Sequence, residues 1–162
     1  MDIIQEKLHS TVGRKRKKAA IGIYPLEKIK LPITYTALPP EKIKFIPLEL
    51  NEEMTAKQIL EKHQTGKEYS NLLDNFEKYP IFIDAKNKIL SMPPIINSNE
   101  TGRVTEETKE AFIECSGSDI STLKKILNII VTTLADMGAE IYAMELFYGK
   151  DKIITPDLKP ET

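Results

Sequence analysis

The first candidate for chemistry in this sequence is Glu114, which lies among apolar residues in the strand-like segment 111–116. Alternate residues of a strand point to opposite faces, so Glu114 shares its face with Phe112 and Ser116. A buried carboxylate is costly unless a donor pairs with it. Glu114 is therefore either a ligand-binding group or a structural or exposed glutamate, and the pattern leaves both interpretations open.

A second candidate is the stretch 91–97, in which Ser91 and Asn97 flank the consecutive prolines Pro93 and Pro94. Proline cannot donate to a sheet ladder, and successive prolines favour an extended polyproline backbone. We expect them to lift the chain out of the sheet just after Ser91 and to hold the Asn97 amide, which donates and accepts hydrogen bonds, at a fixed place. The alternative is a rigid turn with an asparagine cap.

Five consecutive cations form the sharpest charge feature: Arg14, Lys15, Arg16, Lys17 and Lys18. The chain as a whole carries a net charge of -1, but residues 1–30 carry +5. Such a cluster can bind nucleic-acid phosphates. It can equally be a solvated helix end, because cations are favourable near a helix C-terminus.

The remaining reactive residues suggest neither a nucleophile nor a metal site. His9 and His63 both fall in predicted helices, and no Ser/His/Asp order indicates a triad. We expect His63 to lie on the surface and Cys115 to be a small core residue. One cysteine and two distant histidines cannot make a four-ligand zinc site, and a single cysteine suits a reducing cytosol.

Length and composition favour a soluble globular protein. The chain has 162 residues, 41% of them hydrophobic and 29% charged, which fits one domain of ordinary size. It contains no apolar run long enough to span a membrane and no signal-peptide pattern at its start. We therefore expect a cytoplasmic protein without membrane contact.

Hydrophobic periodicity predicts a mixture of helices and strands. A capping box at residues 55–58 starts one helix, a second helix is expected from about 67 to 76, and Asp119 is the expected N-cap of a long helix that ends before Gly138. Residues 84–88 have the composition of a hairpin loop. Strands are expected at residues 19–24, 33–38, 43–46, 81–83, 89–91, 111–115, 141–148 and 153–154.

Without regular alternation of strands and helices, these elements predict an α+β fold. We expect a single domain over residues 1–154, with a β-sandwich or barrel-like core flanked by helices and the 119–137 helix packed on it. Residues 155–162 have the composition of a linker.

Several of these segments together resemble the B3/B4 domain of phenylalanyl-tRNA synthetase β subunits, and the archaeal and eukaryotic branch is the closer match. The most specific block is Ser-Met-Pro-Pro-Ile-Ile-Asn at residues 91–97. The other matching segments are Tyr79-Pro80, the Asp84 turn, Phe112 to Asp119, His9 to Arg16, Ala20-Ile21-Gly22 and Thr155 to Leu158. The resemblance covers nearly the whole chain, while the aminoacylation motifs of that family are absent. The chain is thus expected to be a piece of a larger subunit.

The resemblance implies post-transfer editing, in which tyrosine wrongly attached to phenylalanine tRNA is hydrolysed. A pocket built for phenylalanine cannot strongly reject the same ring with one added hydroxyl, so a second site must remove the error. The resemblance also implies an aminoacyl-tRNA ester hydrolase without a cofactor or covalent intermediate. Its expected partners are the tyrosine-bearing acceptor end of tRNA(Phe), the rest of the β subunit and the α subunit.

The residues of that expected site follow from matching positions. Ser91 and Asn97, with Pro93 and Pro94 between them, correspond to pocket positions, and Phe82 corresponds to a residue of the wall. Glu114 matches a glutamate that accepts the tyrosine hydroxyl in the bacterial branch. Contacts to tRNA are expected from Arg14, Lys15, Arg16 and Lys18, whereas the group that positions the attacking water is not identified.

Two other classes of function compete with editing. The chain could be a non-catalytic tRNA-binding module, with the basic segment supplying phosphate contacts. It could also be a structural domain that serves subunit assembly. Deacylation of mischarged tRNA separates editing from pure binding, because a binder leaves the ester intact.

Overall fold

The computed structural model describes residues 2–158, which form two compact units. One unit comprises residues 20–116, and the other comprises residues up to 19 together with those from 117 onward. Both mix helices and strands, so the α+β class is confirmed. The strands form several small open sheets and do not close into a barrel. Within residues 2–158, no helix is long and apolar enough to cross a membrane.

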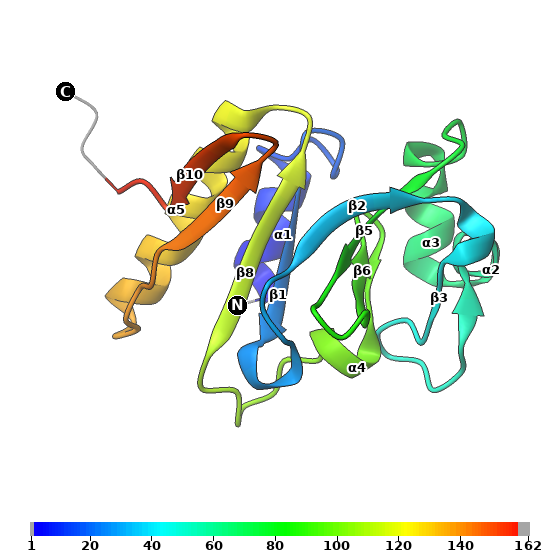
Figure 1. Cartoon of the computed structure of the whole chain (residues 1–162), viewed down its shortest axis with the longest axis horizontal. Coiled ribbons are helices and arrows are strands. Elements are labelled where there is room, and N and C mark those ends of the chain that lie inside the picture. The colour runs from blue at the N-terminus through cyan, green and yellow to red at the C-terminus, as the bar shows by residue number, and fades with distance from the viewer. Residues whose placement is uncertain (1, 159–162) are drawn as a thin grey trace. The chain divides into compact units, whose positions relative to one another are not determined.

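The unit of residues 20–116 contains most of the strands (Figure 1). Its elements are β1 (Ala19–Pro25), β2 (Thr34–Leu38), β3 (Lys44–Phe45), β4 (Met54–Thr55), α2 (Ala56–Lys62), α3 (Gln64–Tyr69), β5 (Tyr79–Ile83), β6 (Ile89–Met92), β7 (Ile96–Asn97), α4 (Asn99–Gly102) and β8 (Ala111–Gly117), with short 3₁₀ turns at Leu26–Lys28, Pro40–Lys42 and Ser70–Leu72.

A four-stranded antiparallel sheet in the order β2-β5-β6-β7 is the centre of this unit. β1 and β8 form a separate two-stranded sheet, and β3 pairs with β4. Asp84 closes the β5–β6 hairpin by accepting hydrogen bonds from the backbone amides of Lys86 and Lys88 on Oδ1, and from that of Lys30 on Oδ2. The predicted hairpin at 84–88 is therefore confirmed.

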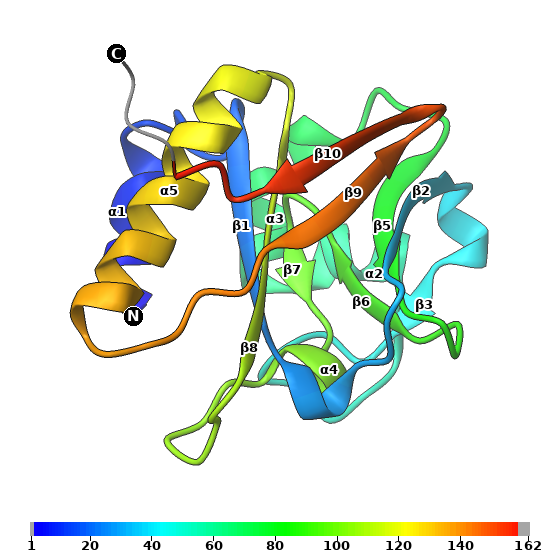
Figure 2. The same cartoon turned by 60° about the vertical axis from the view of Figure 1, so that its left-hand side comes forward.

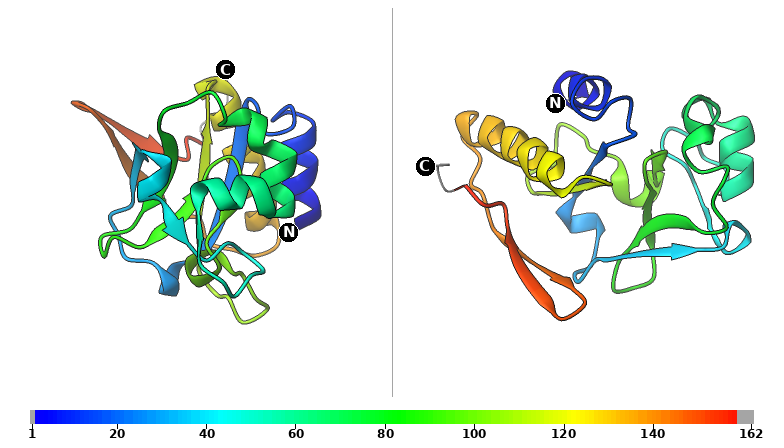
Figure 3. Two further views of the ribbon diagram at one scale, coloured as in Figure 1. Left: turned by 90° about the vertical axis from the view of Figure 1, so that its right-hand side faces the viewer. Right: turned by 90° about the horizontal axis from the view of Figure 1, so that it is seen from above.

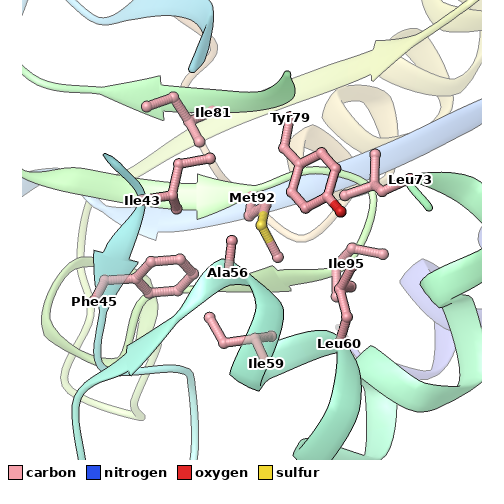
Figure 4. Packing of buried hydrophobic residues seen from close by; sticks show 10 residues of the cluster. All are labelled: Ile43, Phe45, Ala56, Ile59, Leu60, Leu73, Tyr79, Ile81, Met92 and Ile95. Atoms are coloured by element: carbon pink, nitrogen blue, oxygen red, sulfur yellow. The ribbon is translucent and has the colours of Figure 1, made fainter. Parts of the chain in front are cut away.

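One face of the four-stranded sheet packs against α2, which forms the main apolar core (Figure 4). Ile59 and Leu60 of α2 meet Ile81 of β5 and Met92 of β6. The predicted capping box starts this helix, since Thr55 Oγ1 accepts from the Gln58 amide and the Gln58 side chain accepts from the Thr55 amide. The opposite face of the sheet points away from this core.

The helix predicted from 67 to 76 is wrong. α3 begins at Gln64 and ends at Tyr69, beside α2, and a 3₁₀ turn follows it (Figure 3). Gly66 lies inside α3, where a Cβ would collide with the backbone carbonyl of Ile59. His63 is buried and caps α3, its Nδ1 accepting from the Thr65 amide, so the surface position expected for it is also wrong.

The other unit contains α1 (Asp2–Ser10), α5 (Ile120–Asp136) and a hairpin of β9 (Met144–Tyr148) and β10 (Asp151–Thr155) (Figure 2). Asp119 caps α5 by accepting from the amides of Ser121 and Thr122, and Gly138 follows the helix with a φ of +95°. The predicted long helix and its ends are thus confirmed. The expected linker begins inside β10 at Thr155, and its residues 159–162 lie outside the described residues.

Candidate functional site

Four polar side chains meet in the unit of residues 20–116, around the hydroxyl of Tyr24. That hydroxyl lies 2.8 Å from Ser91 Oγ, 3.3 Å from Glu114 Oε1 and 3.4 Å from Asn97 Oδ1. The Asn97 and Glu114 oxygens are therefore less than about 7 Å apart. β1, β6, β7 and β8 each supply one of the four residues, so the structure brings together the predicted Ser91, Asn97 and Glu114.

The register of the sheet explains why Ser91 and Asn97 meet. Ser91 of β6 lies directly opposite Asn97 of β7 and also opposite Phe82 of β5, and Phe82 in turn lies opposite Tyr35 of β2. Directly opposed residues project from the same face of a sheet. Tyr35, Phe82, Ser91 and Asn97 therefore form one row across the four strands, which we call the cross-strand row.

The cross-strand row lies on the face of the sheet opposite α2. Ile81 and Met92, which alternate with Phe82 and Ser91, point into the core under α2. Phe82 instead packs with Tyr24 and Leu90, and Phe112 of β8 joins that cluster. The predicted pocket-wall residue, Phe82, thus lies beside the polar groups.

Pro93 and Pro94 form the turn between β6 and β7 rather than lifting the chain out of the sheet. Their peptide bond is cis, and the amide of Ile95 donates to the carbonyl of Met92. The chain therefore reverses and pairs with β6 again, which sets Asn97 opposite Ser91. The expectation of an extended polyproline segment is wrong, and the alternative of a rigid turn is correct.

Asn97 packs against α4, the short helix that follows it. The sequence patterns did not predict this helix. Ser98 caps α4 by accepting from the amide of Glu100. A Cβ on Gly102 would lie 2.7 Å from Cβ of Asn97 and 3.2 Å from its Nδ2. Only a glycine at position 102 leaves room for the asparagine in this position.

Glu114 is buried, with 9% of its surface exposed. Burial raises the pKa of its carboxyl group from 4.5 to about 8, and the hydrogen bond from Tyr24 and the influence of the nearby Ser116 hydroxyl only partly oppose this rise. The group is therefore largely protonated at neutral pH, and it both donates and accepts hydrogen bonds. The hydrogen bond between Tyr24 and Glu114 at neutral pH is therefore one with a neutral acid.

One oxygen of the Glu114 carboxyl group has no well-formed hydrogen bond to any residue that the structure describes. Among residues 2–158, Glu114 Oε2 and Ser116 Oγ are buried without a well-formed hydrogen bond. The Ser116 hydroxyl influences the carboxyl group electrostatically, although its geometry falls short of a bond. Unpaired buried polar atoms are rare, and each costs about 1–3 kcal/mol. Glu114 therefore has capacity to bind one more hydrogen-bonding group.

Tyr24 is the residue of the site that the sequence reasoning missed. Its side chain is fully buried, and burial, followed by the nearby charge of Glu114, raises the pKa of its hydroxyl well above the usual value. A buried tyrosine requires a partner for its hydroxyl, which was the available signal in the apolar segment 19–24. The sequence did not show which strand supplies that partner.

The predicted tRNA-binding residues lie in the other unit, just after α1. Arg14, Lys15 and Arg16 have φ values of 49°, 53° and 64°, so three successive residues adopt the left-handed conformation. Arg14, Lys15 and Lys17 are exposed. Arg16 instead pairs with Glu6 at 3.0 Å, and Lys18 lies 3.6 Å from Asp119. Three of the five cations are thus exposed, while two make contacts within the protein.

The buried His9 lies beside this basic turn. Its Nδ1 lies 3.2 Å from Glu6 Oε1, the same oxygen that accepts from Arg16. The carbonyl of His9 accepts from the amide of Arg16. His9 therefore helps to hold the turn in place.

The fold resembles part of an aminoacyl-tRNA ligase subunit. The crystal structure of an N-terminal fragment of the phenylalanyl-tRNA synthetase β subunit from Pyrococcus horikoshii superimposes with a TM-score of 0.93 at 46% identity, over 97% of this chain and 45% of that one. No protein-family model matches the chain.

Curated relatives of similar sequence are phenylalanine–tRNA ligase β subunits. Those of Thermococcus sibiricus and Pyrococcus abyssi are each 46% identical over 158 residues, and that of Methanococcus aeolicus is 45% identical over 159. Each alignment covers 98% of this chain. The chain spans 28% of the length of these relatives.

Proposed function

We propose that this chain is the editing domain of a phenylalanine–tRNA ligase β subunit and that it hydrolyses tyrosine wrongly attached to tRNA(Phe). The similarity to β subunits along 98% of the chain supports the assignment to that subunit. The editing activity rests on the site around Glu114, described above.

The observation that carries the proposal is the unpaired Oε2 of the buried Glu114. Its Oε1 already accepts from the hydroxyl of a phenol, that of Tyr24, and the same hydroxyl contacts Ser91 and Asn97. These groups are therefore suited to hold a phenolic hydroxyl, which is the one group that distinguishes tyrosine from phenylalanine. Bound phenylalanine would leave Oε2 unpaired, so the site would select tyrosine.

Hydrolysis itself requires little from the protein, because an aminoacyl ester is already activated. A positioned water attacks the carbonyl carbon of the ester, and a few fixed dipoles stabilise the negative charge that develops on the carbonyl oxygen. The exposed cations at 14, 15 and 17 are the candidates for tRNA contacts.

Deacylation of purified Tyr-tRNA(Phe) tests the proposal. The chain should release tyrosine faster than buffer alone, and should release phenylalanine from Phe-tRNA(Phe) much more slowly. A chain that binds the tRNA but leaves both esters intact would instead be a binding module. Co-purification with an α subunit without any deacylation would favour a role in subunit assembly.

A further inference from the structure

The cross-strand row extends beyond the polar groups to Tyr35, which is not among the site residues predicted from the sequence. Exposure rises from 2% at Ser91 to 9% at Phe82 and 55% at Tyr35, while Asn97, beyond Ser91 in the row, is half-buried. β2, which carries Tyr35, is an edge strand of the sheet. From the buried Ser91 towards β2, the row therefore leads to an aromatic side chain in solvent.

The Tyr35 ring is held in place by its neighbour in the row. It stacks on Phe82 with the ring centroids 4.6 Å apart and the planes inclined by 30°. Burial, followed by the charge of Glu114, raises the pKa of Tyr35. Phe82 in turn packs against Tyr24, so the stacked ring of Tyr35 continues the cluster that surrounds the polar groups.

We propose that Tyr35 is a stacking platform for a purine base, namely the terminal adenine of the tRNA whose ribose carries the ester. This inference rests on the proposed function. A tyrosyl group whose hydroxyl binds at Glu114 has its ester directed away from the buried Ser91 and Glu114. The exposed end of the row is then where the ribose and base lie.

The dimensions of the sheet agree with this order of groups. Neighbouring strands are about 4.8 Å apart, so Tyr35 on β2 and Ser91 on β6 are separated by roughly 10 Å. That separation suits a ligand whose phenol and base are joined through an ester and a ribose. Tyr35 is already fixed by Phe82, so stacking immobilises little additional side chain.

Equilibrium binding of two stable ligands tests the platform directly. The first is tyrosyl-adenosine with an amide in place of the ester, and the second is tyrosinamide, which has no base. Tyr35→Ala should weaken binding of the first by roughly 5- to 150-fold, as expected for the loss of one base–aromatic stack. Its affinity for tyrosinamide should stay within about 2-fold of that of the parent.

Two further variants make the experiment decisive. Tyr35→Phe keeps the ring and should bind both ligands like the parent. Tyr148→Ala removes another exposed strand tyrosine, 77% exposed, and should also match the parent. Circular dichroism melts confirm that each variant is folded.

Three outcomes would overturn the inference. An unchanged affinity of Tyr35→Ala for tyrosyl-adenosine would show that the ring makes no contact. An equal loss for both ligands would place the ring on the amino acid instead, and a loss in Tyr35→Phe equal to that in Tyr35→Ala would assign the effect to the hydroxyl. Absence of deacylation together with Tyr35-dependent binding would overturn the proposed hydrolysis and leave the platform supported.

Discussion

Gly22 of β1 faces the carboxyl group of Glu114 so closely that a Cβ at position 22 would collide with Glu114 Oε1. The same Cβ would also meet the hydroxyl and ring of Tyr24. The glycine therefore creates the space in which the buried acid and the buried phenol lie together.

Gly22→Ala should accordingly disturb both stability and the site. We expect the free energy of unfolding to fall by about 1–3 kcal/mol, as for other overpacked cores, because the new methyl group meets the buried Tyr24 and Glu114. Deacylation of Tyr-tRNA(Phe) should fall further than the folded fraction alone explains. Urea denaturation and deacylation on the same preparation measure the two effects. Parental stability with parental activity would contradict the close packing.

Tyr24→Phe removes only the hydroxyl that joins Ser91, Asn97 and Glu114. We expect it to cost about 1–3 kcal/mol of stability, because it leaves buried polar groups without a partner. The hydrogen bond from Tyr24 lowers the pKa of Glu114, so the pKa in the variant should rise above its value of about 8 in the parent. The pH dependence of unfolding reports that shift, which mere loss of packing would not produce. An unchanged pH dependence would mean that the hydroxyl does not interact with the acid.

Substitutions of Glu114 separate recognition from catalysis. Glu114→Ala leaves the buried phenolic hydroxyl of the substrate without this partner, at a cost of about 1–3 kcal/mol, and should lower the rate of tyrosine release by roughly 5- to 150-fold. Release of phenylalanine should change less, so the ratio of the two rates is the informative quantity. Glu114→Gln keeps the shape and a neutral donor and acceptor, and should retain more of the tyrosine activity than the alanine variant. Equal loss of both activities at unchanged stability would assign Glu114 to catalysis or to tRNA contact.

The raised pKa of Glu114 also makes stability depend on pH. The folded protein holds this proton up to about pH 8, whereas the unfolded chain releases it near 4.5. The stabilising contribution of the proton is therefore complete below about 4.5 and is lost as pH rises towards 8. Across this window the free energy of unfolding of the parent should fall relative to that of Glu114→Gln by about 1.4 kcal/mol per pH unit. Denaturant titrations at half-unit steps measure the difference, and parallel curves would show that Glu114 is ionised when folded.

The exposed cations of the basic turn after α1 predict that the affinity for tRNA falls as the salt concentration rises. Replacing the exposed Arg14, Lys15 and Lys17 by alanine should reduce the slope of log affinity against log salt by roughly 0.7 to 0.9 per lost phosphate contact. Arg16→Ala is the matched comparison, because Arg16 pairs with Glu6 and should affect stability more than the salt slope. Filter binding at several salt concentrations gives the slope. An unchanged slope in the triple variant would leave these cations as solvated surface residues.

Sequence patterns predicted the elements whose signals are local. The capping box at Thr55, the cap at Asp119 and the hairpin at Asp84 each depend on residues within a few positions, and all three are present. The helix predicted from 67 to 76 differs from α3, which spans Gln64–Tyr69 and includes Gly66 where it packs against the backbone of Ile59. Periodicity contains no information about such a contact.

The site was predictable only in part for the same reason. The alternation along residues 111–116 correctly grouped Glu114 with Phe112, and the double proline correctly marked the region of Asn97. The cross-strand row, however, is created by pairing between strands that are far apart in the chain. Tyr24 is 67 residues from Ser91, and no local pattern relates the two.

The cross-strand row also makes strand register a determinant of what the site can recognise. If β2 slipped by one residue against β5, a threonine, Thr34 or Thr36, would lie opposite Phe82 in place of Tyr35. The aromatic end of the row would then turn to the other face of the sheet, with no change in the sequence. Mutations in the loops that flank this edge strand could therefore alter ligand choice without touching a single ligand-contacting side chain.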